Sequence, residues 1–287
     1  MNIKGRVIGI DLGGTQVRAG KIRDGSLEAT HALKVRSQGT VEEVMEDLYS
    51  VTDALIDPTV AAIGIGVPSV VDLDSGVVYE VQNIPSWKEV PLRQWMEARY
   101  KIPVQVNNDA NCFALGELYF GKGMGKQNLI GLTVGTGLGA GIIIGGKLYA
   151  GANCGAGEFG MVAYLDKHFE FYCCGQFFTN VYGIDGNEVY QMALAGDARA
   201  REMYHEMGTH LGNAIKMILY TYDADLIILG GSVREAYPFF REGLWDQVRT
   251  LAYTRTAQKL VIEISTLEHS GLLGAAALCY DADITHK

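Results

Sequence analysis

The chain has 287 residues, of which 24 are Lys or Arg and 33 are Asp or Glu, so its formal net charge is −9. Nucleic acids and anionic membranes bind clustered positive charge, and we therefore expect neither as a partner. Hydrophobic residues make up 48% of the sequence and charged residues 20%, which is typical of a folded globular protein.

The cysteine content and the apolar segments of the sequence predict the cellular compartment of the protein. Five cysteines are an odd number, and no secretory leader is evident before a strand-like run that starts at Arg6. Glycines or charged residues interrupt every apolar run before it reaches the roughly 20 residues that a membrane-spanning helix needs. We expect reduced thiols and a cytoplasmic protein.

A repeat is visible along the chain. Residues 7–27 read as a buried strand, a glycine turn, a second strand, a tight hairpin at Asp24-Gly25 and a third strand. Residues 130–149 repeat that order, with Gly145-Gly146 at the hairpin. Two copies of one unit predict two similar domains.

Helices and strands alternate in the rest of the sequence. Thr40-Val41-Glu42-Glu43 is a capping box that opens the first helix. Periodicity predicts helices over 41–55, 91–100, 110–120, 204–222 and 272–279, and strands over 60–66, 104–106, 226–229 and 260–264. The pattern predicts an α/β fold with a mixed sheet in each half. From the repeat we place one domain at 1–112, joined by the C-terminal helix at 272–287, and the other at 113–271.

Glycine loops follow three of the predicted strands. In Asp11-Leu12-Gly13-Gly14-Thr15 the backbone amides and the Thr15 hydroxyl suit phosphate oxygens, while Asp11 suits Mg²⁺, directly or through water.

The loop containing Gly135, Thr136 and Gly137 offers the same cradle without a carboxylate, and Gly230-Gly231 permits close approach of a flat ring such as adenine. The alternative is that the first two loops are ordinary hairpin turns and the third an ordinary strand-to-helix turn. We further expect Gly135 and Gly137 to adopt backbone conformations that a Cβ would strain.

Five motifs resemble, in order, those of the ROK family of bacterial sugar kinases and repressors. They are Asp11–Thr15, Asn107–Asn111 with Leu115-Gly116-Glu117, Gly135–Gly141, Gly151-Ala152-Asn153 with Gly157-Glu158, and Leu229-Gly230-Gly231. The resemblance covers nearly the whole chain. It implies a two-domain actin/hexokinase-like fold of the ribonuclease H type, with duplicated mixed sheets and with ATP and sugar in the cleft between the domains.

The resemblance also assigns roles in catalysis and sugar binding. It places the catalytic base on Asp109, at the predicted N-terminus of a helix, where a carboxylate is favoured. The alternative is that Asn108 or Asp109 only caps that helix. Asn83, Asn108, Asp109 and Glu158 fall where the family binds sugar hydroxyls, the alternatives for Asn83 and Glu158 being a loop Asx-turn and a solvated side chain.

The sequence departs from the family in its zinc segment. The position of the family's histidine is Met161, the cysteine run is Tyr172–Thr179 with only Cys174 matching a ligand, and a later family glutamate falls on Val181. A structural Zn²⁺ needs four nitrogen or sulfur ligands, so we expect no zinc. We expect Met161, Phe177 and Phe178 to replace the metal by packing.

The function that we expect is ATP-dependent phosphorylation of a hexose, of the glucokinase type, with Mg²⁺ as cofactor. The alternatives are an N-acetylmannosamine or N-acetylglucosamine kinase, or a non-catalytic sensor of sugar or nucleotide. The repressor branch of the family carries an N-terminal helix-turn-helix, which we do not expect ahead of Arg6. The resemblance further implies a homodimer.

Overall fold

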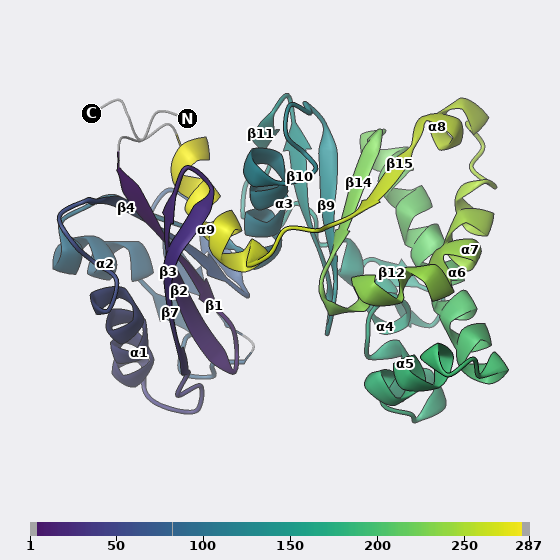
Figure 1. The fold of residues 1–287 in the computed structure, drawn as a ribbon, viewed down its shortest axis with the longest axis horizontal. Coiled ribbons are helices and arrows are strands. Elements are labelled where there is room, and N and C mark those ends of the chain that lie inside the picture. Colours follow the sequence, from purple (N-terminus) through teal and green to yellow (C-terminus); the bar gives the residue numbers. More distant parts are fainter. Residues whose placement is uncertain (1–4, 82, 283–287) are drawn as a thin grey trace. The chain divides into compact units, whose positions relative to one another are not determined.

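The computed structural model describes residues 5–81 and 83–282. Within it the chain divides into two compact units (Figure 1). Unit 1 holds residues up to 127, residues 141–156 and those from 266 onward; unit 2 holds residues 128–140 and 157–265. This division lies away from the expected boundary at residue 112, because the helix at 109–120 packs on the C-terminal helix and stays with unit 1.

Unit 1 is built on a five-stranded sheet of order β3-β2-β1-β4-β8. Its strands are β1 (Arg6–Leu12), β2 (Gln16–Arg23), β3 (Ser26–Lys34), β4 (Val60–Val67) and β8 (Val104–Asn108). β1, β2 and β3 form the predicted antiparallel meander, while β4 and β8 run parallel to β1. The mixed sheet places the carboxyl ends of β1 and β8 at one edge, where the first glycine loop and the Asn108-Asp109 pair follow.

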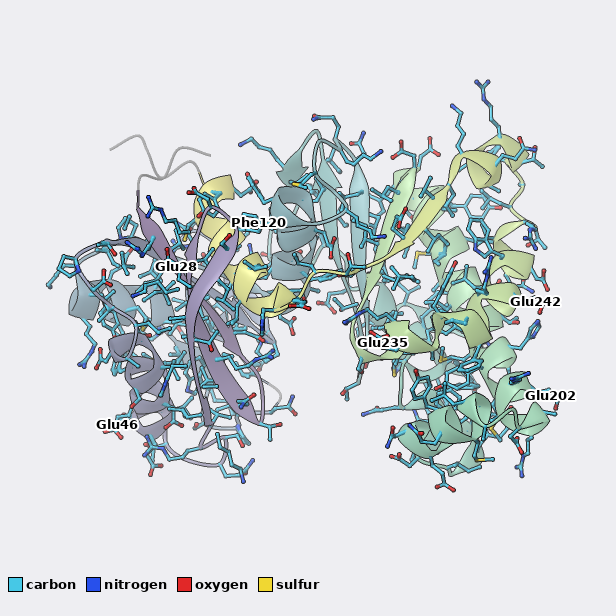
Figure 2. The ribbon with its side chains drawn as sticks, viewed as in Figure 1. Glu28, Glu46, Phe120, Glu202, Glu235 and Glu242 are labelled. Atoms are coloured by element: carbon cyan, nitrogen blue, oxygen red, sulfur yellow. The ribbon has the colours of Figure 1, made fainter. Side chains whose placement is uncertain are left out.

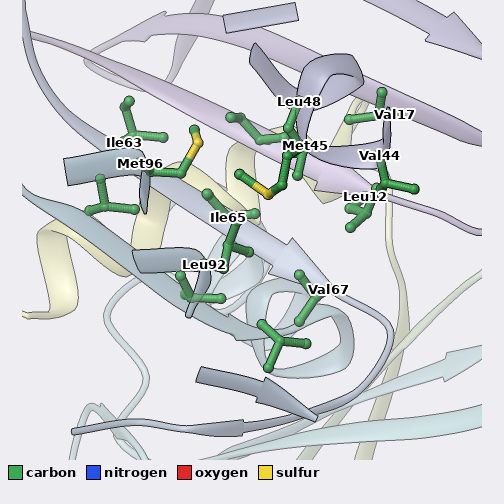
Figure 3. Close-up of a cluster of buried hydrophobic side chains, with 14 of the residues drawn as sticks. Leu12, Val17, Val44, Met45, Leu48, Ile63, Ile65, Val67, Leu92 and Met96 are labelled. Atoms are coloured by element: carbon green, nitrogen blue, oxygen red, sulfur yellow. The ribbon is translucent and has the colours of Figure 1, made fainter. Parts of the chain in front are cut away.

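Helices α1 (Val41–Asp53) and α2 (Leu92–Tyr100) provide the apolar cover of this sheet. Leu48 of α1, Ile65 of β4 and Met96 of α2 belong to one fully buried cluster (Figure 3). The predicted capping box is present, since Thr40 Oγ1 accepts from the Glu43 amide and the Glu43 carboxylate accepts from the Thr40 amide at 2.8 Å. Strands β5 (Val70–Asp72), β6 (Val77–Tyr79) and β7 (Glu89–Val90) form a small separate sheet.

Helices α3 (Asp109–Phe120) and α9 (Ser270–Asp281) pack together in unit 1, and α9 also contacts β1 and β4. Close approach requires glycine here: a Cβ at Gly64 would lie 1.8 Å from the Ala275 carbonyl oxygen. Gly64 of β4 is therefore required for the close packing of α9 on this strand. Residues 283–287 of the expected C-terminal helix lie outside the described residues.

The second five-stranded sheet has the order β11-β10-β9-β14-β15. Its strands are β9 (Leu129–Val134), β10 (Leu138–Ile144), β11 (Lys147–Leu148), β14 (Leu226–Gly230) and β15 (Val261–Ile264). β14 runs parallel to β9 and β15, and β11 runs antiparallel to β10. The repeat in the sequence thus corresponds to two similar strand arrangements, as predicted.

The helices of unit 2 are α4 (Phe169–Cys173), α5 (Gly186–Leu194), α6 (Ala198–Tyr222), α7 (Tyr237–Val248) and α8 (Thr254–Lys259). Shorter elements are β12 (Ala163–Tyr164), β13 (Lys167–His168), the 3₁₀ segments η1 (Phe159–Met161) and η3 (Ser232–Ala236), and the π-helical turn η2 (Phe178–Tyr182). α6 begins six residues earlier than predicted because Asp197 caps it. Among the described residues no helix is both long and apolar enough to cross a bilayer.

Candidate functional site

The first glycine loop is a tight turn that leaves two amides without a protein partner. The Gly13 amide donates to the Gln16 carbonyl oxygen at 2.9 Å and closes the turn between β1 and β2. Within the described residues, the amides of Gly14 and Thr15 have no acceptor. The loop is therefore a hairpin turn and also offers two N–H groups and the exposed Thr15 hydroxyl to an anion.

Asp11 lies at the end of β1 and is ion-paired in this structure. Its Oδ2 accepts from Arg18 Nη2 on β2, and its carboxylate lies against Gly271 in the first turn of α9, where a Cβ would be 2.6 Å from Oδ2. A carboxylate oxygen is a suitable ligand for Mg²⁺, which usually takes only one or two protein carboxylates beside phosphates and waters. Arg18 competes with a cation for this carboxylate.

Asn83 lies against the first loop. A Cβ at Gly14 would be 2.5 Å from Asn83 Cβ and 3.0 Å from Asn83 Cγ, so the glycine is needed for this approach. Asn83 is exposed, whereas Ile84 and Trp87 of the same segment are fully buried and anchor it. The expected phosphate loop and the expected sugar segment thus meet within unit 1.

The Asn108-Asp109 pair forms the N-terminus of α3. Asn108 Oδ1 accepts from the amides of Ala110 at 2.8 Å and Asn111 at 3.4 Å, and Asn108 Nδ2 donates to the Ser69 carbonyl oxygen at 3.4 Å. Asp109 is exposed, and its Oδ1 accepts from the Ala110 amide at 2.8 Å. Asn108 is therefore a helix cap, and the carboxylate of Asp109 lies at the positive end of the α3 dipole.

A buried polar network that the sequence analysis missed supports this helix start. Asn107 Oδ1 accepts from the Asn108 amide at 2.8 Å, from Asn111 Nδ2 at 2.9 Å and from Cys154 Sγ at 3.2 Å. Asn107 and Asn111 are almost completely buried. The family resemblance includes both residues, but only the fold brings Cys154 to them.

The second glycine loop lies within unit 2 and, like the first, is closed by a backbone hydrogen bond of its leading glycine. The Gly135 amide donates to the Gly137 carbonyl oxygen at 3.0 Å, which leaves the amides of Thr136 and Gly137 without an acceptor among the described residues. The Gly175 amide donates to the Gly135 carbonyl oxygen at 2.7 Å and holds the loop from the cysteine segment. The expected strained backbone is wrong for Gly135 and Gly137, because neither has a positive φ.

The glycine at position 137 is explained by a neighbouring side chain. A Cβ there would lie 2.6 Å from Glu170 Oε2, and the same oxygen accepts from the Leu138 amide at 2.8 Å. Glu170, on α4, is a carboxylate beside an expected phosphate loop. No motif in the sequence predicts a role for Glu170.

Glu158 is exposed and precedes the short helix η1. The preceding residue, Gly157, has a φ of +99°, and a Cβ added there would lie 2.1 Å from the Ala140 carbonyl oxygen. Only glycine therefore fits at this position before Glu158. Partial burial, and secondarily the charge of Glu170, raise the pKa of the Glu158 carboxyl above its ordinary value. The charge of Glu170 therefore acts on the Glu158 carboxyl within unit 2.

A pocket of about 570 Å³ opens beside the second loop and lies entirely within unit 2. Gly135 and Thr136 line it, together with Ser232, which follows the third glycine loop. Aromatic and polar residues of the cysteine segment, α5 and α6 complete the wall, among them Phe178, Tyr190, Tyr204, Asp185 and Asn187. Glu235 of η3, labelled in Figure 2, also lines it. This volume and wall suit a flat heterocyclic ring.

The third loop is built for close backbone approach. Gly231 has a φ of +80°, and a Cβ there would lie 2.2 Å from the Val134 carbonyl oxygen at the end of β9. Ser232 Oγ lies 3.8 Å from the Cβ position of Gly135. The second and third loops are thus neighbours, which the sequence pattern suggested only by their shared glycines.

The cysteine segment is an aromatic and apolar cluster. Phe177 and Phe178 are fully buried, as expected, and Cys173 and Cys174 are buried thiols; burial raises the pKa of Cys174 to about 11. The expectation for Met161 is wrong, because its side chain is 52% exposed and packs little.

Ring contacts hold this cluster together and join it to α6. Tyr164 stacks on Phe169 with centroids 4.3 Å apart, and His210 of α6 lies 4.9 Å from the Tyr172 ring. In the described parts of the chain, no three His, Cys, Asp or Glu side chains gather as a metal site. The residues at this position do not fit a structural zinc ion.

The family model for the ROK family matches residues 7–282, which is nearly all of the chain. The chain belongs to the ROK family. ROK sugar kinases have the actin/hexokinase-like fold, and their solved structures match this chain along almost its full length, which confirms the predicted α/β fold.

Three ROK relatives show the range of this similarity. A glucokinase from Streptomyces coelicolor is 29% identical over 326 aligned residues, covering 97% of this chain and 99% of the relative. The structure of a ROK family glucokinase from Streptomyces griseus, in complex with glucose and AMPPNP, is 28% identical, covers 96% of this chain and 99% of that one, and has a TM-score of 0.81. A protein described as a putative xylose repressor from Caldicellulosiruptor is 28% identical and covers 96% of this chain and 78% of the relative.

Proposed function

We propose that the protein is an ATP-dependent sugar kinase that transfers a phosphoryl group to a hexose hydroxyl. The observation that carries the proposal is the pair of glycine loops. Each loop has a threonine hydroxyl and two amides without an acceptor among residues 5–81 and 83–282, and an aromatic pocket opens beside the second loop. The similarity to glucokinases over nearly the full chain supports the same function.

The nucleotide is assigned to loops of matching chemistry. Thr136 and Gly137 bind phosphate oxygens through their amides, Gly135 lines the same pocket, and Gly13, Gly14 and Thr15 provide a second phosphate-binding turn. The adenine ring enters the pocket next to Gly230 and Gly231, where Tyr190 and Tyr204 contribute aromatic walls.

Asp11 is the residue that we assign to Mg²⁺. Its carboxylate follows β1 and adjoins the first loop, so phosphate oxygens and waters can complete the coordination. When bound, the ion neutralises charge on the transferred phosphoryl group. Arg18 must release the carboxylate for direct coordination, whereas contact through water leaves the ion pair intact.

Asp109 accepts the proton of the attacking sugar hydroxyl. Its carboxylate is exposed at the N-terminus of α3, where the helix dipole favours a negative charge and where the Ala110 amide orients it. Asn83, the remaining N–H of the Asn108 amide and the carboxylate of Glu158 bind other hydroxyls of the sugar. The hydrogen bond from the Ala110 amide orients the carboxylate of the base.

Two positions of the family's sugar-binding pattern carry apolar residues in this chain. Met161 and Val181 are both exposed and supply no hydrogen bonds where the family pattern has a histidine and a glutamate. N-acetylmannosamine and N-acetylglucosamine are therefore alternative substrates. Similarity to a putative xylose repressor favours, as a second candidate function, a non-catalytic sensor that binds the same ligands. We also propose a cytoplasmic homodimer, in keeping with the family resemblance and with five buried cysteines that form no disulfide in the described part of the chain.

The test is an ADP-release assay with Mg-ATP across a panel of hexoses and N-acetylhexosamines. We expect at least one sugar to stimulate ADP release well above ATP alone, and Asp109→Asn to remove the stimulation. ADP release that no sugar stimulates, in a protein that still binds nucleotide and sugar, supports the sensor instead.

A further inference from the structure

A second pocket of unit 2, of about 690 Å³, is formed by α7, α8 and β15 (Figure 1). It is lined by Tyr237, Arg241, Trp245, Arg249, Thr254, Ala257, Gln258 and Ile262. None of these residues lines the nucleotide pocket. A concave site of this volume can hold a small molecule.

Four of the lining residues form a single stripe on and just after α7. Tyr237, Arg241, Trp245 and Arg249 are each four positions apart, so a helix places them on one face. Trp245 Nε1 donates to the Tyr237 hydroxyl at 3.1 Å. This bond restrains the indole ring, which lines the pocket together with the two arginines.

The stripe is positively charged in a protein of net charge −9. Arg249 Nη1 lies 3.2 Å from Asp246 Oδ1, but Arg241 has no hydrogen-bond or ion-pair partner among residues 5–81 and 83–282. No Asp or Glu lines the pocket, but Glu242, labelled in Figure 2, lines a smaller hollow that shares Arg241, Trp245 and Arg249 with it. A guanidinium without a partner suits an oxyanion, which it can bind through two parallel hydrogen bonds.

We propose that this pocket is a second ligand site that binds a small phosphate monoester with a ring. The phosphate lies on Arg241, Arg249 adds a second positive charge, and the ring lies on Trp245. Sugar phosphates and nucleoside monophosphates share this chemistry, since a sugar presents C–H groups and a base presents a flat face to an indole. The proposal does not depend on the kinase assignment, because it uses none of the residues assigned to phosphoryl transfer.

The test is titration of tryptophan fluorescence with glucose 6-phosphate, AMP and inorganic phosphate. The fluorescence change of Trp245→Phe comes only from Trp87 and Trp95, including any effect of ligand in the nucleotide pocket. Subtracting it from the change of the wild type gives the signal of Trp245. We expect at least one ring ester to change the Trp245 signal and to bind at least about tenfold more weakly to Arg241→Ala. Arg241→Lys, which keeps the charge and loses the planar fork, should be intermediate. Arg255→Ala, on α8 but outside the lining, is the matched control and should bind within about twofold of wild type.

Four results would overturn the proposal. They are no Trp245 signal with either ester, equal weakening by Arg255→Ala, inorganic phosphate binding as tightly as the esters, and sedimentation that shows a dimer disrupted by Arg241→Ala. The last result would assign the pocket to a second copy of the chain. Because binding is measured without turnover, a failure of the kinase assignment gives none of these results by itself.

Discussion

The carboxylate of Glu170 accepts a hydrogen bond from the Leu138 amide at 2.8 Å, although the two residues are 32 positions apart. The contact places a negative charge beside the second glycine loop, against Gly137. The hydrogen bond fixes the loop, whereas the charge would repel the triphosphate that we propose binds there. Under the proposed function, Glu170 therefore orders the loop and opposes nucleotide binding at the same time.

The first prediction separates these two effects. Glu170→Gln keeps a carbonyl oxygen for the Leu138 amide and removes the charge, so an ATP analogue should bind about three- to fivefold more tightly, as expected for a partly exposed charge. Glu170→Ala removes the acceptor as well, and the gain should shrink. Isothermal titration calorimetry with AMPPNP measures both, with the exposed Glu202→Gln on α6 as control (Figure 2). Weaker binding by Glu170→Gln would contradict the repulsion.

The second prediction concerns the base. Asp109→Asn retains Oδ1 for the Ala110 amide and removes the proton acceptor, so kcat should fall by about 10²- to 10⁴-fold while the sugar Kd stays within about tenfold. Steady-state kinetics and calorimetry on the same preparation check this. A turnover number within a few-fold of wild type would exclude Asp109 as the base.

The third prediction concerns the cap of α3. Asn108→Ala leaves the amides of Ala110 and Asn111 without their side-chain acceptor and should lower the free energy of unfolding by about 1 kcal/mol. Asn108→Asp restores an acceptor and should recover most of that stability. Urea unfolding followed by circular dichroism measures both. A loss of stability equal in the two variants would mean that the cap contributes little.

The fourth prediction is a pH dependence. The Glu158 carboxyl has a raised pKa, caused first by burial and then by the charge of Glu170, and its proposed role in sugar binding requires the ionised form. The acidic limb of kcat/KM for the sugar should therefore lie above the ordinary pKa of a glutamate. Glu170→Gln removes the second cause, so the pKa of Glu158 should fall and the limb should move to lower pH. A limb that moves to higher pH, or that stays in place, would contradict the coupling.

The fifth prediction concerns zinc. The purified protein should contain less than about one-tenth equivalent of zinc, and a chelator should leave its melting temperature unchanged, because the ligands of a tetrahedral site are absent. Elemental analysis and thermal unfolding with and without chelator test this. A stoichiometric zinc content would overturn it.

Local features of this fold are predictable from the sequence because their causes lie within a few residues. The capping box at Thr40 and Glu43 and the cap at Asn108 each involve residues no more than three positions apart. The hairpin turns at Gly13 and Gly135 are also local, and so is the buried strand β14. Periodicity and turn chemistry determine all of these.

Contacts between distant residues are what the pattern cannot provide. Gly175 holds Gly135 across 40 positions, and Glu170 reaches Leu138 only because α4 packs beside the loop. Burial also depends on distant contacts. The hydrophobicity of Met161 predicts a buried side chain, but the short helix η1 leaves this side chain exposed. The sequence predicts the glycine loop at Gly137 but not the reason for the glycine. A side chain there is excluded by the neighbouring carboxylate of Glu170, and not by the φ of Gly137.

The most direct test of the central claim is detection of the transferred group itself. Wild type and Asp109→Asn are incubated with Mg-ATP and each sugar of the panel, and the products are analysed by mass spectrometry. The account predicts one phosphorylated sugar or a few, formed in amounts equal to the ADP released by wild type and nearly absent with Asp109→Asn. ADP formation without a phosphorylated sugar, or equal sugar phosphate from both proteins, would contradict it.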